Sequence, residues 1–77
     1  MKQKFTNNEK VNGEMAVRSL SQKARDFYSG SDIGVYEYKN YQDVTMYAVD
    51  GALGYHDGMT FDELGKFLEA YADEFAD

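Results

Sequence analysis

Apolar residues recur three and four positions apart in residues 13–28, a spacing that collects them on one face of a helix. This face comprises Ala16, Val17, Leu20, Ala24, Phe27 and Tyr28. Asn12 is a suitable N-cap, and Gly30 is suited to a left-handed position at the end of the helix. Glu14 and Arg18 are spaced for an i,i+4 ion pair. The pattern therefore predicts one helix over residues 13–28.

A second amphipathic pattern, in residues 61–77, predicts a C-terminal helix. Half of its helical wheel holds the apolar residues Phe61, Leu64, Phe67, Leu68, Tyr71, Ala72 and Phe75, and every charged residue lies on the other half. Thr60 and Glu63 have the spacing of a capping box, in which each side chain accepts a hydrogen bond from the other residue's backbone amide. The segment thus has a start signal as well as a continuous apolar face.

Between these segments the pattern changes to β-branched and aromatic residues in short alternation, which is typical of strands. Residues 33–39 and 44–49 are predicted to form a hairpin, with residues 40–43 as its turn. Asp50-Gly51 is the sequence that a type I′ turn requires, so we expect a third strand over residues 52–56.

These elements predict a small single α+β domain over residues 1–77. Its order is α-β-β-β-α, with a three-stranded antiparallel sheet and two helices packed on it. The polar residues 1–12 are expected to be a flexible N-terminal arm, and residues 13–77 the folded core. No apolar run approaches the length of a signal peptide or a membrane span, so the expected location is the cytoplasm.

Charge changes the picture, because it is segregated along the chain. Residues 1–30 contain six basic and three acidic residues, whereas residues 31–77 contain two basic and eleven acidic residues. A surface of one sign attracts the opposite sign and repels its own. A basic protein surface is therefore the expected partner, and direct binding to nucleic acid is disfavoured.

The acidic half of the predicted C-terminal helix holds Asp62, Glu63, Glu69, Asp73, Glu74 and Asp77. The helix dipole disfavours the last three of these, because they lie near the C-terminus. One interpretation is that basic residues within the fold, such as Arg18, Lys23 or Arg25, compensate these acids. Another is that a basic partner compensates them, and a third is that the acidic face only keeps the protein soluble.

Tyrosines gather in the predicted hairpin, at positions 36, 38, 41 and 47. Tyr36 and Tyr38 share one face of their strand, and the sequence leaves open whether this face is the core or the solvent side. Tyr41 lies in the turn and is the best candidate for exposure. Exposed tyrosines beside carboxylates form a good contact surface for a protein partner.

The sequence offers no combination of residues for a catalytic or metal site. Cysteine is absent, and His56 has no second histidine or nucleophile at a recognisable spacing. The segment after Asp57 is superficially similar to the end of an EF-hand loop, but aligning Gly58 with the invariant glycine puts Leu53 and Leu64 at ligand positions. We therefore expect no enzyme activity, no cofactor and no metal.

The function that these features favour is a small acidic inhibitor that occupies the basic, nucleic-acid-binding site of a larger protein such as a nuclease. Such nucleic-acid mimics are of the type that phages and mobile elements use against restriction or CRISPR systems, an analogy of size and charge alone. The candidate binding residues are Asp62, Glu63, Glu69, Asp73, Glu74, Asp77, Glu37, Asp43, Tyr41 and Tyr38. The alternative is a regulatory or structural module that dimerises or binds a partner through an apolar patch, with an acidic face that serves only solubility.

Overall fold

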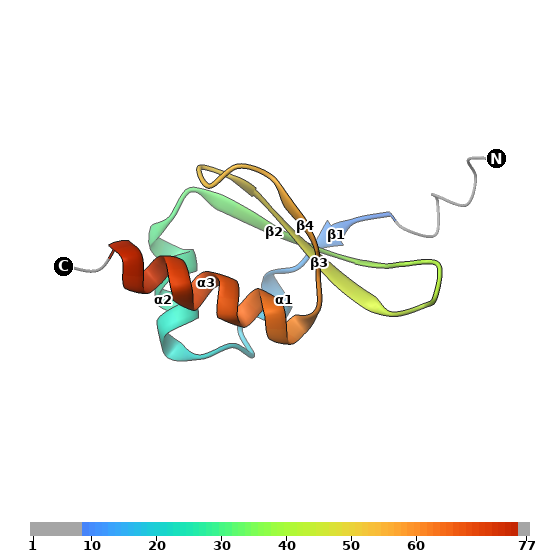
Figure 1. Ribbon diagram of the computed structural model, residues 1–77, viewed down its shortest axis with the longest axis horizontal. Helices are drawn as coiled ribbons and strands as arrows, with labels where there is room; N and C mark the ends of the chain where they lie inside the picture. The colour runs from blue at the N-terminus through green and yellow to red at the C-terminus, as the bar shows by residue number, and fades with distance from the viewer. Residues whose placement is uncertain (1–8, 76–77) are drawn as a thin grey trace.

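An antiparallel sheet forms one layer of the molecule, and helices cover one of its faces (Figure 1). The computed structural model describes residues 9–75, and within them the elements are β1 (Val11–Asn12), α1 (Glu14–Val17), α2 (Gln22–Gly30), β2 (Ile33–Lys39), β3 (Thr45–Gly51), β4 (His56–Met59) and α3 (Phe61–Phe75). The strands lie side by side in chain order. The α+β class and the antiparallel sheet are confirmed, but these residues form four strands and three helices, not three and two.

The additional strand is β1, which lies in the predicted flexible arm. Val11 and Asn12 pair with Glu37 and Tyr36 of β2, and the Gly13 amide donates to the Val35 carbonyl at 2.8 Å. A strand of two residues is too short to show an alternating pattern, so only its pairing with β2 reveals it. The arm prediction is therefore wrong for residues 11–12, and residues 1–8 lie outside the described part of the chain.

The predicted helix over residues 13–28 is two helices. After α1 the backbone tightens into i→i−3 hydrogen bonds, from the Leu20 amide to the Val17 carbonyl at 3.0 Å among others, and Leu20 enters the core. Ser21 then starts α2, because its hydroxyl accepts from the Ala24 amide at 3.2 Å. Two short helices can present the same apolar residues to one core, which is why the spacing did not reveal the break.

Three details at the ends of the predicted helix are also corrected. Gly30 is the last helical residue of α2 and is not among the described residues with positive φ, so it is not a left-handed cap. Glu14 and Arg18 form no ion pair among the described residues, although the Arg18 amide donates to the Glu14 carbonyl at 3.2 Å. The N-cap of α1 is Gly13 and not Asn12, although Asn12 Oδ1 accepts a hydrogen bond from the Glu14 amide at 2.7 Å.

The hairpin of β2 and β3 agrees with the prediction, whereas the turn after it does not. Ile33 through Lys39 pair in unbroken register with Gly51 through Thr45. Asp50 and Gly51 therefore continue β3 instead of forming a type I′ turn, because the start of β2 provides backbone partners for them. The chain turns beyond Gly51, so β4 covers residues 56–59 and not 52–56.

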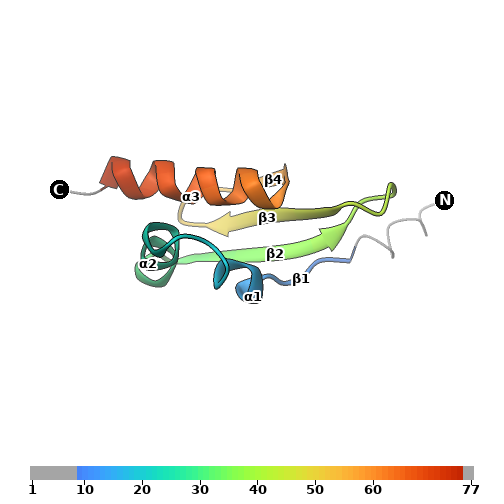
Figure 2. The same ribbon diagram turned by 90° about the horizontal axis from the view of Figure 1, so that it is seen from below.

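Helix α3 is confirmed, including its capping box. The Thr60 amide donates to Glu63 Oε1 at 2.9 Å, and the Glu63 amide donates to Thr60 Oγ1 at 3.2 Å. In Figure 2, α3 runs along β3 and β4 while α1 lies against β2. Leu64 and Leu68 of α3 are fully buried and join side chains of all three helices with Val35, Tyr47 and Val49 of the sheet in one core.

The position of the helices decides the orientation of the tyrosines. Because Val35 faces the core, the alternation of β2 directs Tyr36 and Tyr38 to the opposite, helix-free face of the sheet. Tyr47 lies on the core face and is buried. Tyr41 is 81% exposed at the hairpin tip, as expected from its place in the turn.

Candidate acidic binding surface

The acidic residues of α3 do not all point away from the fold. Asp62, Glu69 and Asp73 lie on the side of the helix that faces α2 and the connection before it. The Ser21 hydroxyl donates to the Glu69 carboxylate, and Lys23 Nζ lies 2.6 Å from Asp73 Oδ1. Glu69 and Asp73 thus have partners in or next to α2.

The structure shows which basic residue compensates the C-terminal part of α3. It is Lys23, whose pKa is raised by its hydrogen bond to Asp73 and by the charge of that carboxylate. Arg25 donates instead to Gln22 Oε1 at 2.7 Å and to the Arg18 carbonyl at 3.3 Å. Among the described residues, intramolecular compensation therefore applies to Asp73.

The other candidate residues of α3 differ in their surroundings. Asp62 pairs with Lys66 at 3.3 Å, and both side chains are about 80% exposed. Glu63 is held by the capping box, and Glu74 is exposed with no described lysine or arginine within ion-pair distance. Asp77 lies outside the described residues. Asp62 and Glu63 therefore make contacts only with α3 and its cap, and Glu74 makes no ion pair with a described residue, so a partner can bind these three acids without disturbing the contact between α3 and α2.

The remaining candidates lie away from α3 and from one another. Tyr41 and Asp43 are at the hairpin tip, which extends past the start of α3, at the opposite end of the molecule from Glu74 (Figures 1 and 2). Glu37 lies on the core face of β2, paired with Tyr47, and Tyr38 lies on the opposite face. The ten candidate residues do not form one continuous surface.

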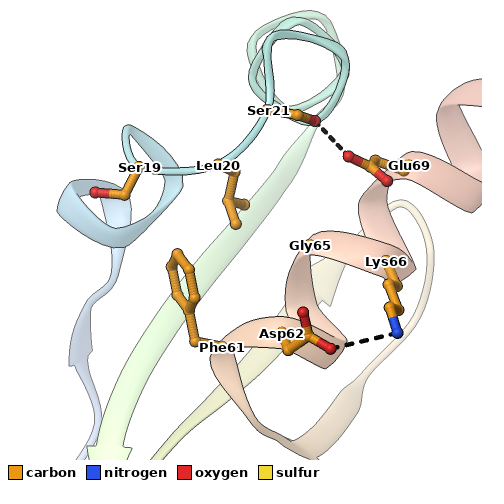
Figure 3. Close-up of a pocket in the computed structure, with 8 residues that line it drawn as sticks. All are labelled: Ser19, Leu20, Ser21, Phe61, Asp62, Gly65, Lys66 and Glu69. Carbon is orange, nitrogen blue, oxygen red and sulfur yellow. Dashed lines mark hydrogen bonds and ion pairs between the residues drawn. The ribbon is translucent and has the colours of Figure 1, made fainter.

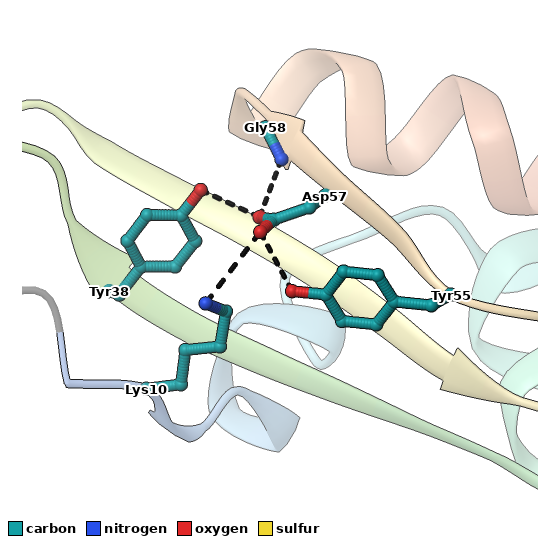
Figure 4. A network of polar contacts seen from close by, with 5 residues as sticks. All are labelled: Lys10, Tyr38, Tyr55, Asp57 and Gly58. Carbon is teal, nitrogen blue, oxygen red and sulfur yellow. Dashed lines mark hydrogen bonds and ion pairs between the residues drawn. The ribbon is translucent and has the colours of Figure 1, made fainter.

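A polar network on the helix-free face was missed by the sequence analysis (Figure 4). The carboxylate of Asp57 accepts hydrogen bonds from Tyr38 Oη at 2.6 Å, Tyr55 Oη at 2.7 Å and the Gly58 amide at 2.6 Å. Lys10 Nζ lies 3.6 Å from the same carboxylate and 4.4 Å from the centre of the Tyr38 ring. The network joins β2, β4 and the residue before β1.

A β-bulge directs Asp57 into this network. Tyr47 pairs with Met59 and Val49 pairs with His56, so β4 has one more residue than the facing part of β3. Gly58 has φ +76°, the left-handed conformation that glycine adopts in the G1 type of β-bulge. The Asp-Gly pair at 57–58 was the available signal, but the predicted strand ended before it.

The network shifts the pKa values of its members in opposite directions. Burial alone would raise the pKa of Asp57, but the hydrogen bonds it accepts and the nearby Lys10 ammonium outweigh burial and lower it. Burial, and then the hydrogen bond to Asp57, raise the pKa of Tyr38 to about 12. A phenol that keeps its proton and a carboxylate that loses its proton are the pair that this hydrogen bond needs.

The Tyr38 pKa predicts a loss of stability at alkaline pH. Because the folded value of about 12 exceeds the reference value of 10.0, this phenol stabilises the fold fully below pH 10.0, and the contribution disappears as pH rises toward 12. Burial also raises the pKa values of Tyr28 and Tyr47, and the hydrogen bond to Asp57 raises that of Tyr55. A spectrophotometric tyrosinate titration should therefore show a late step near pH 12 whose amplitude falls by one tyrosine in Tyr38→Phe. The control is Tyr41→Phe, at the exposed hairpin tip, which should leave the amplitude of the late step unchanged. The same late amplitude in Tyr38→Phe as in the unmodified protein would contradict the assignment.

A groove of about 270 Å³ runs between α3 and the segment that joins α1 to α2 (Figure 3). It is lined by Ser19, Leu20, Ser21, Phe61, Asp62, Gly65, Lys66 and Glu69. Gly65 allows the two walls to approach closely, because a Cβ at this position would lie 3.2 Å from Leu20 Cδ2. The groove thus combines an apolar floor with charged walls.

His56 has structural contacts. Its Nε2 lies 3.0 Å from the Leu53 carbonyl oxygen, and its ring packs against Phe67 with 4.9 Å between ring centres. Within residues 9–75, no three His, Asp or Glu side chains are grouped closely enough to hold a metal ion. In the same residues, no helix combines the length and apolar character needed to cross a membrane.

No family model matches the chain, and neither the curated proteins nor the solved structures include a significant match to it. The function of this protein is therefore inferred from its own geometry and charge.

Proposed function

We propose that this protein is a small, non-enzymatic binding protein whose acidic surface occupies a basic, nucleic-acid-binding site on a larger protein. The observation that carries the proposal is the exposure of its unbalanced negative charge. No charged side chain among the described residues is fully buried, and only Asp57, Asp62 and Asp73 form ion pairs with described basic residues. The remaining described carboxylates form no ion pair with a described basic residue, so their charge is not neutralised within this part of the fold.

The regular spacing of the acids on α3 supports mimicry of a nucleic acid. Residues four apart on a helix rise about 6 Å along its axis, which is on the scale of the spacing between phosphates along a strand. Glu69 and Asp73 have this separation, and Asp62 lies two turns before Glu69 on the same side. Such a row presents its charge to a surface that binds a phosphate backbone when the partner's cations replace Lys66 at Asp62 and Lys23 at Asp73, and both of these are exposed surface ion pairs.

The structure changes which variant tests the proposal best. Reversing the charge of Asp73 or Glu69 would also disturb their contacts with Lys23 and Ser21, and would therefore confuse folding with binding. A neutralising triple variant, Asp62→Asn with Glu63→Gln and Glu74→Gln, avoids this, because Gln at position 63 can still complete the capping box. A matched triple variant at Glu9, Glu14 and Asp32, which are exposed outside α3, removes the same charge.

The experiment passes an extract of the source cells over the immobilised protein at low salt and elutes with a salt gradient and, separately, with duplex DNA or RNA. We expect a nucleic-acid-binding protein that elutes at moderate salt and is displaced by nucleic acid, since charged contacts are screened and the two ligands compete. The immobilised α3 variant should no longer capture this partner, whereas the matched variant should still capture it. A partner that resists salt and nucleic acid, or equal loss in both variants, would contradict the proposal.

One observation favours the alternative of an apolar interaction module. Phe75 is 59% exposed and stacks on Phe27, with 6.1 Å between ring centres, beside a shallow groove that Ala72 also lines. A salt-resistant complex, or a dimer seen by sedimentation, that is lost in Phe75→Ser would identify this patch as the interface.

A further inference from the structure

We infer that the groove between α3 and the α1–α2 connection receives an arginine side chain of the partner. This inference rests on the proposed function, and names the part of the acidic surface where a basic partner is anchored. The floor of the groove is apolar: Leu20 is 9% exposed, and Phe61, which rises toward it, is 41% exposed (Figure 3). This apolar floor distinguishes the groove from a simple cluster of surface carboxylates, because it can contact the aliphatic part of a basic side chain.

The walls of the groove supply two carboxylates with unused acceptor capacity. Asp62 and Glu69 are seven residues apart on the same side of α3, about 10 Å along the helix axis. Glu69 Oε2 accepts from the Ser21 hydroxyl, which leaves its second oxygen without a described hydrogen bond. Asp62 is held only by Lys66, in an ion pair whose two side chains are about 80% exposed. Exposed pairs of this kind exchange easily for a better partner.

Arginine fits this combination better than the other side chains. Its aliphatic stem can lie on Leu20 and Phe61, while its planar guanidinium donates paired hydrogen bonds to a carboxylate. The volume of about 270 Å³ is below the range of about 300–1,000 Å³ typical of pockets for small molecules, so one inserted side chain is the better occupant. Arginine is also among the residues that most often dominate binding energy at protein interfaces.

The test is a titration of the isotope-labelled protein with tri-arginine, tri-lysine and neutral tri-citrulline peptides at low salt, followed by NMR. We expect tri-arginine to shift the amides of Ser19, Ser21, Gly65 and Glu69 most strongly. Saturation should occur at a concentration about tenfold lower than for tri-lysine, because lysine lacks the planar fork. Tri-citrulline should cause no saturable shift, because it has the shape of arginine without its charge.

Two variants separate the groove from the general acidic surface. Phe61→Ser removes the aromatic ring from the floor of the groove without changing the charge, and should weaken tri-arginine binding about tenfold; Tyr41→Ser, at the exposed hairpin tip, should not. Glu69→Gln removes one charge but keeps an acceptor for Ser21, and should weaken binding about threefold or more. Far-UV circular dichroism establishes that each variant is folded, and unchanged amide resonances of Ser21 and Ala24 in Glu69→Gln establish that the contact between α3 and the start of α2 is intact.

The outcomes distinguish this inference from the proposed function. Shifts spread evenly over acids outside the groove, unaffected by Phe61→Ser and Glu69→Gln, would overturn the groove assignment while leaving an acidic surface that binds cations. Failure of both cationic peptides to bind at low salt would overturn the groove assignment together with the proposed function.

Discussion

Leu64→Ala is expected to lower the free energy of unfolding by about 2–5 kcal/mol. Leu64 is 0% exposed at the centre of the core, so the substitution removes buried methyl groups and leaves a cavity. Domains are stable by about 5–15 kcal/mol, and short chains bury a smaller fraction of their surface than long ones. For a chain of 77 residues, this loss should consume much of the total stability.

Chemical denaturation followed by circular dichroism measures this effect, with two controls. Leu64→Met conserves volume and should cost less than about 1.5 kcal/mol. Val44→Ala truncates a side chain that is 45% exposed in the hairpin loop, and surface changes of this kind are usually within about 0.5 kcal/mol. A cost for Leu64→Ala similar to that of Val44→Ala would mean that α3 packs on the sheet through another face.

Gly51→Ala is expected to be the second strongly destabilising change. Gly51 has φ +124°, a conformation that residues with a Cβ rarely adopt, and this strain should cost about 1–3 kcal/mol. A Cβ would also lie 2.5 Å from the Asp32 carbonyl oxygen and 2.9 Å from Ile33 Cα. Because both contacts are with backbone atoms, β2 and β3 would have to separate locally, at a further cost of about 1–3 kcal/mol.

Two other glycines are matched controls for the same substitution. Gly30→Ala meets no atom within 4 Å and does not need positive φ, so it should be neutral or stabilise the fold by about 0.4–1 kcal/mol. Gly58→Ala has open space but φ +76°, so it should cost the strain alone, about 1–2 kcal/mol. The denaturation midpoint should therefore be highest for Gly30→Ala, lower for Gly58→Ala and lowest for Gly51→Ala. Equal midpoints for the Gly51 and Gly30 variants would contradict the position of Asp50 and Gly51 within β3.

The acids of α3 differ in whether they also hold the fold together, which matters for testing the proposed inhibitor. The carboxylates of Glu69 and Asp73 act within the fold, joining α3 to α2, while Asp62, Glu63 and Glu74 remain available. Substitutions at the first pair are expected to loosen the two helices as well as weaken binding. A loss of binding in those variants is therefore informative only when the helix contact is shown to be intact.

Helix α3 and the hairpin could be predicted from the sequence because their signals are local. The capping box joins Thr60 and Glu63 within one turn, and the amphipathic face continues from Phe61 to Phe75. The alternation in β2 and β3 likewise pairs residues across a short turn. In each case the residues that specify the element also make its hydrogen bonds.

Tertiary structure decided three features that the sequence did not reveal: the break between α1 and α2, the register of Gly51 and the strand β1. The apolar spacing of residues 13–28 suits one helix or two, and only packing on the sheet selects the turn that buries Leu20. Asp50-Gly51 is a turn sequence by local preference, but residues 33–34 provide partners that extend the strand. Local preference yields wherever a distant segment supplies more hydrogen bonds or buried area.

The candidate site shows the same division. By itself, the sequence determined the net negative charge, the charged side of α3 and the exposure of Tyr41 in its turn. Only the tertiary structure decided that Asp73 meets Lys23, fifty residues away, and that Tyr38 faces Asp57 on the helix-free side. The groove beside Gly65 also exists only in the folded chain. The reason is that charge and amphipathicity are sums over nearby residues, whereas ion pairs and grooves depend on which distant segments the core brings together.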